Sequence, residues 1–444
     1  MTGRTILLGG AQLPLAEEAS MAGGRAALYS IEGCADYFVR IYREPLSPHQ
    51  ERKLRRMLTM SPPLGNRPTH EPLSPELAWP TALVKSPDGA VIGYAMHCFG
   101  GPDHVLLAGL LTRSGRLRFL PRGAGWQFLL GVGWNLAFIV TRMHHEGLVI
   151  GDLSSGNVIV DRSGFVTFLD WDSIDFTDPV TEEHFPSLAW TPGYCAPERQ
   201  RGGSATAAGD DFALAVLIYQ LLTGGDHPYG GVSHGSSSDA TVQDNIASGI
   251  SYVVYPDRVT APHSTIDPAV LPPALLQLAQ AAFGRGAGDP AKRPDSAEWL
   301  RALDQERSRI QACTARPGHT YGSHLSACPW CEHADTTGLD IFNPVTPSGS
   351  LPMSAADDAP PHSDAVGGLR HPVDDRREER RRPAERRLRS RVPWQAFLDG
   401  AGGTFDLFGG AKRPREPLPA FEATLADDVH ELCLALGLTA EDDN

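Results

Sequence analysis

Three side chains near the middle of the sequence have the types and the spacing that phosphoryl-transfer chemistry requires. Asp152 and Asn157 follow a short apolar run, and Asp170 ends another apolar run after an Asp-Arg-Ser-Gly turn. We expect a hairpin here that brings all three side chains to one end. Carboxylate and amide oxygens are the ligands that Mg²⁺ prefers, and a carboxylate beside a hydroxyl group orients it for attack on a phosphate. The pattern therefore predicts phosphoryl transfer with a bound divalent cation.

This stretch resembles the catalytic core of the protein-kinase superfamily, whose motifs are D-x4-N and D-F-G. The second motif is changed, because Trp171 and Asp172 take the places of Phe and Gly. The resemblance implies that Asp152 orients or deprotonates the hydroxyl group of the substrate. It also implies that Asn157 and Asp170 hold Mg²⁺ on the phosphates of ATP.

Motifs farther along the chain strengthen the resemblance. Thr191–Glu198 reads T-P-G-Y-C-A-P-E, which is similar to the end of a kinase activation segment. Asp210, followed by an apolar helix expected over 212–222, resembles the buried aspartate that supports the catalytic loop. Arg293 resembles the late arginine of the family, which pairs with the glutamate of the A-P-E motif. The loss of either residue of such a buried pair would leave the charge of the other without a partner.

The nucleotide-binding part of the sequence is less regular than the family pattern. Gly23 and Gly24 resemble a degenerate glycine-rich loop, whose backbone amides would cover the phosphates of ATP. Met96, His97 and Cys98 are the expected hinge that grips adenine. These two segments are the predicted contacts of the chain with the nucleotide, in addition to one basic side chain.

That basic side chain is Arg40, which stands where the family has its phosphate-binding lysine. The substitution keeps the positive charge but loses the compact ammonium group, so it is not conservative. Glu51 is the predicted partner of Arg40 on the following helix, although an exposed helix charge is an equally good interpretation. Lys53 or Lys85 is an alternative source of the missing ammonium group.

Other departures from the family concern the catalytic loop. Ile150 and Gly151 replace the usual His-Arg before the catalytic aspartate, and Ser154 replaces the usual lysine after it. Without an arginine at position 151 to receive a phosphate, control by phosphorylation of the activation segment is less expected. Lost transition-state contacts of this sort each cost on the order of 10²–10³ in rate. An attenuated kinase is therefore among the interpretations.

Cysteine and histidine residues gather between about 311 and 340. Cys313, Cys328 and Cys331 have the spacing of a structural zinc site, in which a Cys-x2-Cys knuckle brings two thiolates to one ion. We predict His324 as the fourth ligand, with His319 as the alternative. Four protein ligands would make the site structural rather than catalytic. The competing interpretation is a group of reduced cysteines without metal.

The elements that must position these groups change along the chain. Strand-like segments dominate the first part, whereas helical patterns dominate from Trp126 to Arg307. This order predicts an α+β fold, bilobal and kinase-like, with a small zinc-binding appendage and a disordered C-terminal linker. The predicted divisions are an N-lobe over 1–98, a C-lobe over 99–310, a zinc knuckle over 311–340, an Arg- and Pro-rich linker over 341–394, and a tail with a short amphipathic helix over 395–444.

Composition limits the remaining classes of protein. The 444 residues are 41% hydrophobic and 21% charged, which is enough apolar material for a large core. The formal net charge of -14 argues against attachment of the whole chain to nucleic acid or to an anionic membrane. The sequence has no apolar run of membrane-spanning length, no signal-peptide core at its start and only seven cysteines, so we expect a cytoplasmic protein.

Three motifs resemble those of a divergent group of bacterial kinases. Gly151–Asn157 reads G-D-x4-N, Asp170–Ser173 reads D-W-D-S, and the C-P-W-C sequence at 328–331 is also similar to that group. Some members carry helix-hairpin-helix DNA-binding tails, and some accompany tellurite-resistance-type phosphatases and von Willebrand-domain proteins. The tail here has no helix-hairpin-helix signature. The resemblance, which covers about residues 20–335, therefore implies a phosphatase or von Willebrand-domain partner rather than nucleic acid.

These patterns lead to three hypotheses about function. The leading one is an ATP-dependent protein serine/threonine kinase that acts in bacterial signalling on an unknown protein substrate. The first alternative is a pseudokinase scaffold that binds nucleotide without turnover. The second is a small-molecule phosphotransferase of the aminoglycoside or choline kinase kind. The A-P-E motif, Asp210 and Arg293 disfavour that class, because its members lack this activation segment.

Overall fold

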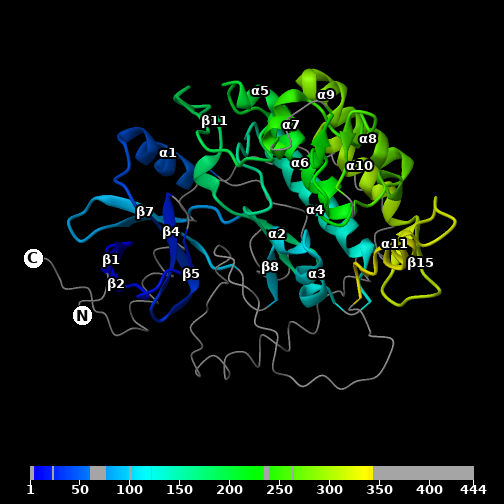
Figure 1. The fold of residues 1–444 in the computed structure, drawn as a ribbon. Coiled ribbons are helices and arrows are strands. Elements are labelled where there is room, and N and C mark those ends of the chain that lie inside the picture. The colour runs from blue at the N-terminus through cyan, green and yellow to red at the C-terminus, as the bar shows by residue number, and fades with distance from the viewer. Residues whose placement is uncertain are drawn as a thin grey trace, which may run out of the picture.

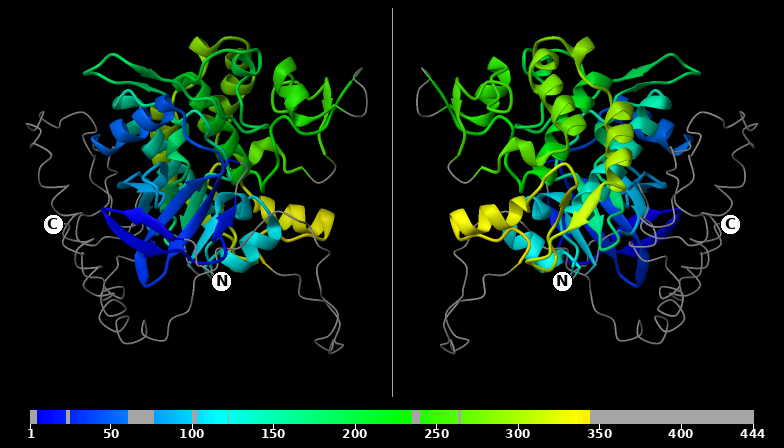
Figure 2. Two further views of the ribbon diagram at one scale, coloured as in Figure 1. Left: turned by 90° about the vertical axis from the view of Figure 1, so that its left-hand side faces the viewer. Right: turned by 90° about the vertical axis from the view of Figure 1, so that its right-hand side faces the viewer.

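The structure is a computed structural model that describes residues 5–22, 25–60, 77–99, 103–121, 123–234, 240–262 and 265–343. Gly23, Gly24, most of the predicted linker and the whole predicted tail lie outside these residues. Figure 1 shows a strand-rich N-terminal part beside a larger helical part, which makes the fold α+β. In the left view of Figure 2 the strands of the first part face the viewer, and helices lie behind and above them.

The first part is built on an antiparallel sheet of seven strands in the order β2-β1-β6-β7-β5-β4-β3. Buried and less buried side chains alternate along β1, because successive side chains of a strand point to opposite faces. The pairing of β5 with β7 sets Arg40 opposite Tyr94. The strands are β1 (Thr5–Leu8), β2 (Ala11–Pro14), β3 (Met21–Ala22), β4 (Ala26–Ile31), β5 (Cys34–Tyr42), β6 (Ala82–Lys85) and β7 (Val91–His97).

Helix α1 (Pro48–Leu58) packs between this sheet and the helical part. Its start is well defined, because Ser47 and Gln50 form a capping box and Pro48 occupies the first turn. Leu54 and Met57 are buried on its inner face. Trp79 donates from its indole nitrogen to the backbone oxygen of Met57 at 3.0 Å, and its ring lies 5.6 Å from that of Trp171. The helix is therefore fastened to the segment that carries Asp170.

The second part is mainly helical, with short two- and three-stranded sheets at its edges. Its main helices are α4 (Trp126–His145), α6 (Ala207–Leu222), α8 (Pro273–Phe283) and α10 (Ser296–Arg307). Shorter helical elements are α2 (Leu107–Leu110), α3 (Arg113–Phe119), η1 (Trp171–Ser173), α5 (Pro197–Gln200), α7 (Val242–Ser248), η2 (Pro268–Val270), α9 (Arg285–Gly288), η3 (Pro290–Lys292) and α11 (Pro329–Thr337). Its strands are β8 (His104–Leu106), β9 (Val158–Asp161), β10 (Val166–Phe168), β11 (Phe176–Thr177), β12 (His184–Phe185), β13 (Val232–Ser233), β14 (Val259–Thr260), β15 (Ile310–Ala312) and β16 (Thr320–Gly322).

Two helices, α4 and α6, form the centre of the helical core. Nearly every residue of α6 is buried, including Phe212 and Leu217, as expected for a helix that is apolar on all sides. α4 packs against both α6 and α10. The hairpin expected between Asn157 and Asp170 is present as β9 and β10, which pair from Val158–Phe168 to Val160–Val166. This hairpin brings Asn157 and Asp170 to the same end, because Asn157 directly precedes Val158 and Asp170 follows Phe168 by two residues.

An ion pair fastens the end of the A-P-E motif to the loop before α10. Arg293, whose side chain is completely buried, donates to Glu198 at 2.9 and 3.1 Å. It also donates to the backbone oxygens of Gly286 and Ala208. The pair lies 95 residues apart in sequence and joins α5, α6 and α9.

We expect Arg293→Met to destabilise the protein by about 3–5 kcal/mol, because Glu198 and two backbone oxygens would lose a buried cationic partner. The midpoint of urea-induced unfolding measures this change. Arg285→Met, at an exposed position on α9, is the matched control and is expected to have little effect. Equal midpoints for the two variants would contradict the role of the pair.

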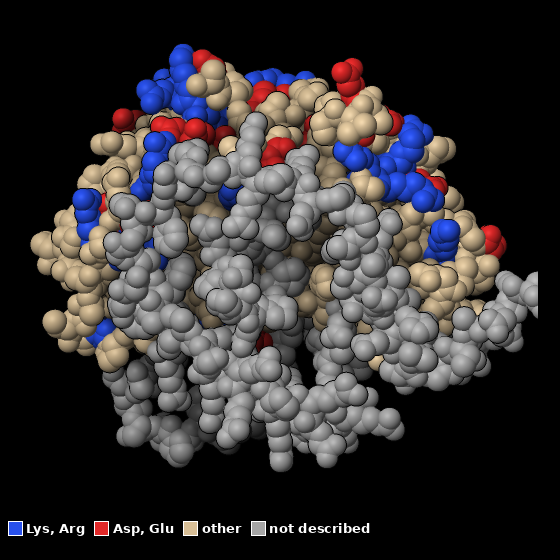
Figure 3. Space-filling model, turned by 180° about the vertical axis from the view of Figure 1, so that it is seen from behind, with Lys and Arg blue, Asp and Glu red and all other residues tan. Residues whose placement is uncertain are grey.

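None of the helices in the described residues is long and apolar enough to cross a membrane. On the face shown in Figure 3, Lys and Arg side chains lie among Asp and Glu side chains over the described part of the surface. Charges of both signs are therefore interspersed there.

Candidate active site

A cleft of about 390 Å³ lies between the sheet and the helical part. Side chains from both parts line it, among them Arg40 and Met96 from the sheet and Asp152, Asn157 and Asp170 from the other side. The structure therefore brings together the three oxygen-bearing residues and the basic residue that the sequence singled out. Arg40 and Asp152, which are 112 positions apart in the chain, meet at this cleft only because the two parts fold against each other.

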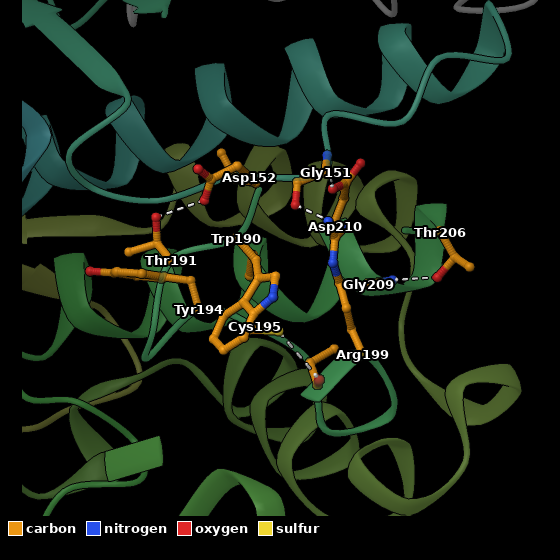
Figure 4. A pocket seen from close by; sticks show the side chains of 13 residues that line it. Gly151, Asp152, Trp190, Thr191, Tyr194, Cys195, Arg199, Thr206, Gly209 and Asp210 are labelled. Carbon is orange, nitrogen blue, oxygen red and sulfur yellow. Dashed lines mark hydrogen bonds between the residues drawn. The ribbon is translucent and has the colours of Figure 1, made fainter. Parts of the chain in front are cut away.

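Residues 150–157, called the catalytic loop here, hold Asp152 and Asn157 in fixed relation. The side-chain nitrogen of Asn157 donates to the backbone oxygen of Asp152 at 2.9 Å, and its backbone oxygen accepts from the amide of Leu169 at 2.8 Å. Thr191 donates from its hydroxyl group to Oδ1 of Asp152 at 2.6 Å (Figure 4). The Asp152 carboxylate is thus a hydrogen-bond acceptor facing a hydroxyl group, which is the arrangement needed to orient an alcohol.

A buried aspartate supports this loop from below. Asp210, near the start of α6, accepts hydrogen bonds from the backbone amides of Ile150 at 2.7 Å and Gly151 at 2.9 Å. Its Oδ2 also lies 3.1 Å from Nε2 of His144. Burial alone would lower the pKa of His144, but the hydrogen bond and the charge of Asp210 raise it. The sequence-based expectation that Asp210 lies beneath the loop is met by these contacts.

Asp170 has an uncommon backbone conformation at the end of the β9–β10 hairpin. Its φ of 60° lies in the left-handed region, which non-glycine residues seldom adopt and which is found at functional sites. Burial raises the pKa of the Asp170 carboxyl group, against the lowering effect of Arg40. The conformation directs the carboxylate into the cleft, where it is among the lining side chains.

Arg40 forms ion pairs with the carboxylates of the D-W-D motif. Its Nη2 lies 3.2 Å from Oδ2 of Asp170 and 3.4 Å from Oδ1 of Asp172. Burial would lower the pKa of Arg40, but the charges of Asp172 and Asp170 raise it above its usual value. The predicted pairing with Glu51 is wrong. Glu51 instead accepts from Arg55, one turn along α1, at 2.6 and 2.9 Å.

Neither lysine offered as an alternative stands in the position of a free phosphate-binding ammonium group. Lys53 is among the residues that line the cleft, but its ammonium group donates to the backbone oxygens of Asp172 at 2.9 Å and Ile174 at 2.5 Å. Burial lowers the pKa of Lys53 to about 8. Lys85 is exposed at the end of β6 and is not among the residues that line the cleft. Lys53 therefore connects α1 to the D-W-D segment.

Of the three predicted hinge residues, the structure places Met96 in the lining of the cleft but not His97 or Cys98. Met96 is buried and lines the cleft, as does Phe99, which the sequence analysis did not select. The ring of His97 stacks on that of Tyr37 at 4.9 Å, and the half-buried thiol of Cys98 lies 4.0 Å from the oxygen of Phe99. An aromatic side chain two residues after β7 is the sequence signal that could have found Phe99. The predicted glycine-rich loop at 23 and 24 lies outside the described residues, but the neighbouring Arg25 lines the cleft.

A second candidate site lies outside the cleft, in the segment after α10. Cys313, His319, Cys328 and Cys331 place one potential ligand atom each within 4.8 Å of one another. The Sγ atoms of Cys313 and Cys331 are 3.6 Å apart, and Nδ1 of His319 lies 3.5 Å from the Sγ atoms of Cys328 and of Cys331. Such spacings suit four atoms around one tetrahedral ion with metal–sulfur distances of about 2.3 Å.

The histidine of this cluster corrects the sequence-based choice. His324 lies apart from the thiols, with its Nε2 3.3 Å from the backbone oxygen of Ala269. β15 and β16 pair so that the amide of Cys313 donates to the oxygen of His319, which sets these two residues side by side. His319 is completely enclosed, and its Nε2 lies 2.9 Å from Oδ1 of Asp340. A carboxylate in that position orients the imidazole toward a ligand on the other nitrogen.

The sequence is similar to those of bacterial protein kinases. The chain is 30% identical over 334 residues to protein kinase YegI of Escherichia coli O157:H7, covering 72% of this chain and 49% of that protein. It is 29% identical over 189 residues to the serine/threonine-protein kinase PknD of Chlamydia felis, covering 39% and 18% of the two chains. It is 29% identical over 85 residues to the serine/threonine-protein kinase PrkC of Bacillus subtilis, covering 19% and 13%.

These relatives support a bacterial protein kinase-like family for this chain. The chain spans about half the length of the two YegI proteins that it matches. No family model matches the sequence. The α+β architecture and the cleft described above are in keeping with that kinase-like family.

Proposed function

We propose that the protein is a serine/threonine kinase that transfers the γ-phosphoryl group of ATP to a hydroxyl group of another protein. The observation that carries this proposal is the meeting of Asp152, Asn157 and Asp170 in one cleft, with Arg40 opposite them. The similarity to bacterial protein kinases supports the same class of reaction. The chain spans about half the length of the YegI proteins, so the proposal is argued from the described residues of this chain.

The donor atoms at the cleft fit a hard divalent cation. Asp170 offers a carboxylate, and Asn157 is held by its side-chain nitrogen on the catalytic loop, which leaves its oxygen as a ligand atom. Mg²⁺ bound there with ATP would neutralise charge on the phosphates during transfer. Met96, Phe99 and Leu169 add apolar surface to the cleft, which suits a nucleobase.

Asp152 would act on the acceptor hydroxyl group. The acceptor hydroxyl group would take the place of the Thr191 hydroxyl group, which now donates to the Asp152 carboxylate. The carboxylate would take up the proton of the acceptor hydroxyl group as the oxygen–phosphorus bond forms. The bond between the γ-phosphorus and the bridging oxygen breaks, so ADP leaves with the bonding electrons. The products are a phosphate ester on the acceptor and ADP, and the proton passes from Asp152 to solvent.

Arg40 would have two partners in turn. In the structure it neutralises Asp170 and Asp172. An approaching triphosphate competes with Asp170 for the same guanidinium group, and Asp172 holds Arg40 at the cleft during the exchange. The planar fork of arginine suits this change of partner better than a lysine would, because it engages two acceptors at once.

A protein, rather than a small molecule, is the proposed acceptor. The segment from 186 to 191 lies beside the cleft and presents Leu188 and Trp190, which are 71% and 39% exposed. Exposed apolar side chains next to the catalytic aspartate suit contact with a polypeptide. A phosphatase or von Willebrand-domain partner stays a prediction from the sequence, as does a cytoplasmic location.

We also propose that Cys313, His319, Cys328 and Cys331 bind one structural Zn²⁺. The four ligand atoms and the Asp340 carboxylate behind His319 support this assignment. Arg113 of α3 donates to the backbone oxygens of Asp340 and Asn343, so the cluster is joined to the helical part. The ion would therefore hold the segment after α10 against the rest of the protein.

Transfer of label from [γ-³²P]ATP tests the proposed reaction. The purified chain is incubated with Mg²⁺ and dephosphorylated casein, and mass spectrometry then locates phosphate on Ser or Thr. A small-molecule arm with choline and kanamycin as acceptors runs in parallel. Label on protein hydroxyl groups, with none on the small molecules, is the expected result.

The shift of the melting temperature with MgADP distinguishes the remaining outcomes. A shift without turnover on any acceptor would favour the pseudokinase interpretation. Transfer to choline or kanamycin alone would favour the small-molecule class. The absence of both a melting-temperature shift and phosphate transfer would contradict the nucleotide site itself.

A further inference from the structure

Arg199 joins the catalytic loop to the segment that runs beside it. Its Nη1 donates to the backbone oxygen of Gly151 at 3.0 Å, directly before the catalytic aspartate (Figure 4). Its Nη2 donates to the oxygens of Ser187 and Ala189 at 3.3 and 2.6 Å, and to the hydroxyl oxygen of Ser187 at 3.1 Å. One planar cation thus holds two chain segments that lie 36 positions apart.

Gly151 leaves room for this arrangement. It has a φ of 79°, in the left-handed region that favours glycine. A Cβ atom at this position would come too close to the side chain of Ser187 and within 3.1 Å of the oxygen of Ser173. Ser187 therefore occupies the space beside position 151, where the family pattern has an arginine. The guanidinium group at this place comes from Arg199 of α5 instead.

Additional contacts fix the segment between Asp170 and Glu198, called the activation segment here. Arg56 on α1 lies 2.8 Å from the buried carboxylate of Asp178, and Arg52 lies 2.8 Å from the partly exposed carboxylate of Glu183. Asp175 accepts from the amide of Ser187 at 3.0 Å. The partners of these cations are side-chain carboxylates of the chain itself, where a regulated kinase would use an added phosphate.

We propose that Arg199 is a positioning residue that replaces the missing catalytic-loop arginine and keeps the activation segment in place without phosphorylation. This inference rests on the proposed kinase function, and it concerns how the kinase is kept active. All hydrogen-bond partners of the Arg199 terminal nitrogens given above are neutral oxygens of the protein. A phosphate group is therefore not needed to satisfy the guanidinium group.

The main experiment compares Arg199→Met with Arg201→Met, which removes an exposed arginine two residues later. With casein as acceptor, we expect Arg199→Met to lower kcat on the order of 10²-fold, because the loop that carries Asp152 would lose its position. The KM for ATP and the MgADP-induced shift in Tm should not change, since Arg199 does not line the cleft. Arg199→Lys should recover only part of kcat, because an ammonium group cannot span both segments.

Two further arms test the absence of phosphate control. Wild-type protein treated with a broad-specificity phosphatase, and the variant Thr177→Ala/Thr181→Ala, should keep the wild-type kcat. Hydrogen exchange of the amides from 176 to 191 should be faster in Arg199→Met than in Arg201→Met, a result that requires no catalysis. If the wild type transfers no phosphate, this arm still decides the structural role of Arg199.

Three results would overturn the inference. Equal kcat values for Arg199→Met and Arg201→Met would remove Arg199 from positioning. Equal exchange in the two variants would show that Arg199 does not hold the segment. A loss of kcat after phosphatase treatment would show that the segment depends on phosphate after all.

Discussion

Asp152→Asn is expected to lower the rate of phosphoryl transfer by about 10²–10⁴-fold, the usual contribution of a positioned general base. The amide keeps the size of the side chain and an oxygen that accepts from Thr191, but it cannot take the proton. Binding of MgADP should be preserved, because the proposed metal ligands are Asn157 and Asp170. The measurement is label transfer from [γ-³²P]ATP to casein, together with the MgADP-induced shift in Tm.

The matched control for this substitution is Asp257→Asn, at an exposed position remote from the cleft lining. It should transfer label at the wild-type rate. A wild-type rate for Asp152→Asn would exclude Asp152 from proton transfer. Loss of the MgADP shift in Asp152→Asn would indicate a defect in folding or binding rather than in the chemical step.

Cys328→Ser is expected to abolish binding of one zinc ion per chain and to loosen the segment from 311 to 340. Structural zinc sites contribute roughly 10–16 kcal/mol of apparent binding free energy to the folded state of small metal modules. Removal of one thiolate ligand should therefore have a larger effect on this segment than any single packing contact. Zinc content by mass spectrometry and protease cleavage between 311 and 340 measure the two effects.

Cys34→Ser is the control, since Cys34 lies in the N-terminal sheet and outside the cluster. It should retain the zinc. His319→Ala should lose zinc, whereas His324→Ala should keep it, because only His319 lies beside the thiols. Wild-type protein without bound zinc after purification in zinc-containing buffer would contradict the site.

The proposed catalytic centre was largely predictable from sequence, because Asn157 and Asp170 lie at the same end of one hairpin. Asn157 directly precedes β9 and Asp170 follows β10 by two residues, so the turn between those strands fixes their relation. The same holds for Asp210, whose place at the start of an apolar helix is a local feature. Glu198 and Arg293 are distant in sequence, and it was the resemblance to kinases that paired them.

The partners of Arg40 and the zinc-site histidine were not predictable in the same way. The resemblance to kinases offered Glu51 on the helix after Arg40, but that side chain lies against Arg55 on the same helix. His319 and His324 have similar spacings from the cysteines, and only the β15–β16 pairing distinguishes them. Arg199 gave no signal, because its contacts depend on how the activation segment lies over the catalytic loop.

The most direct measurement is a crystal structure of the protein with Mg²⁺ and a non-hydrolysable ATP analogue. We expect the metal ion on Asn157 and Asp170, the terminal phosphate next to Asp152, and Arg40 turned from Asp170 toward a phosphate oxygen. An analogue bound away from these residues, or a metal ion that touches neither Asn157 nor Asp170, would contradict the proposed catalytic centre.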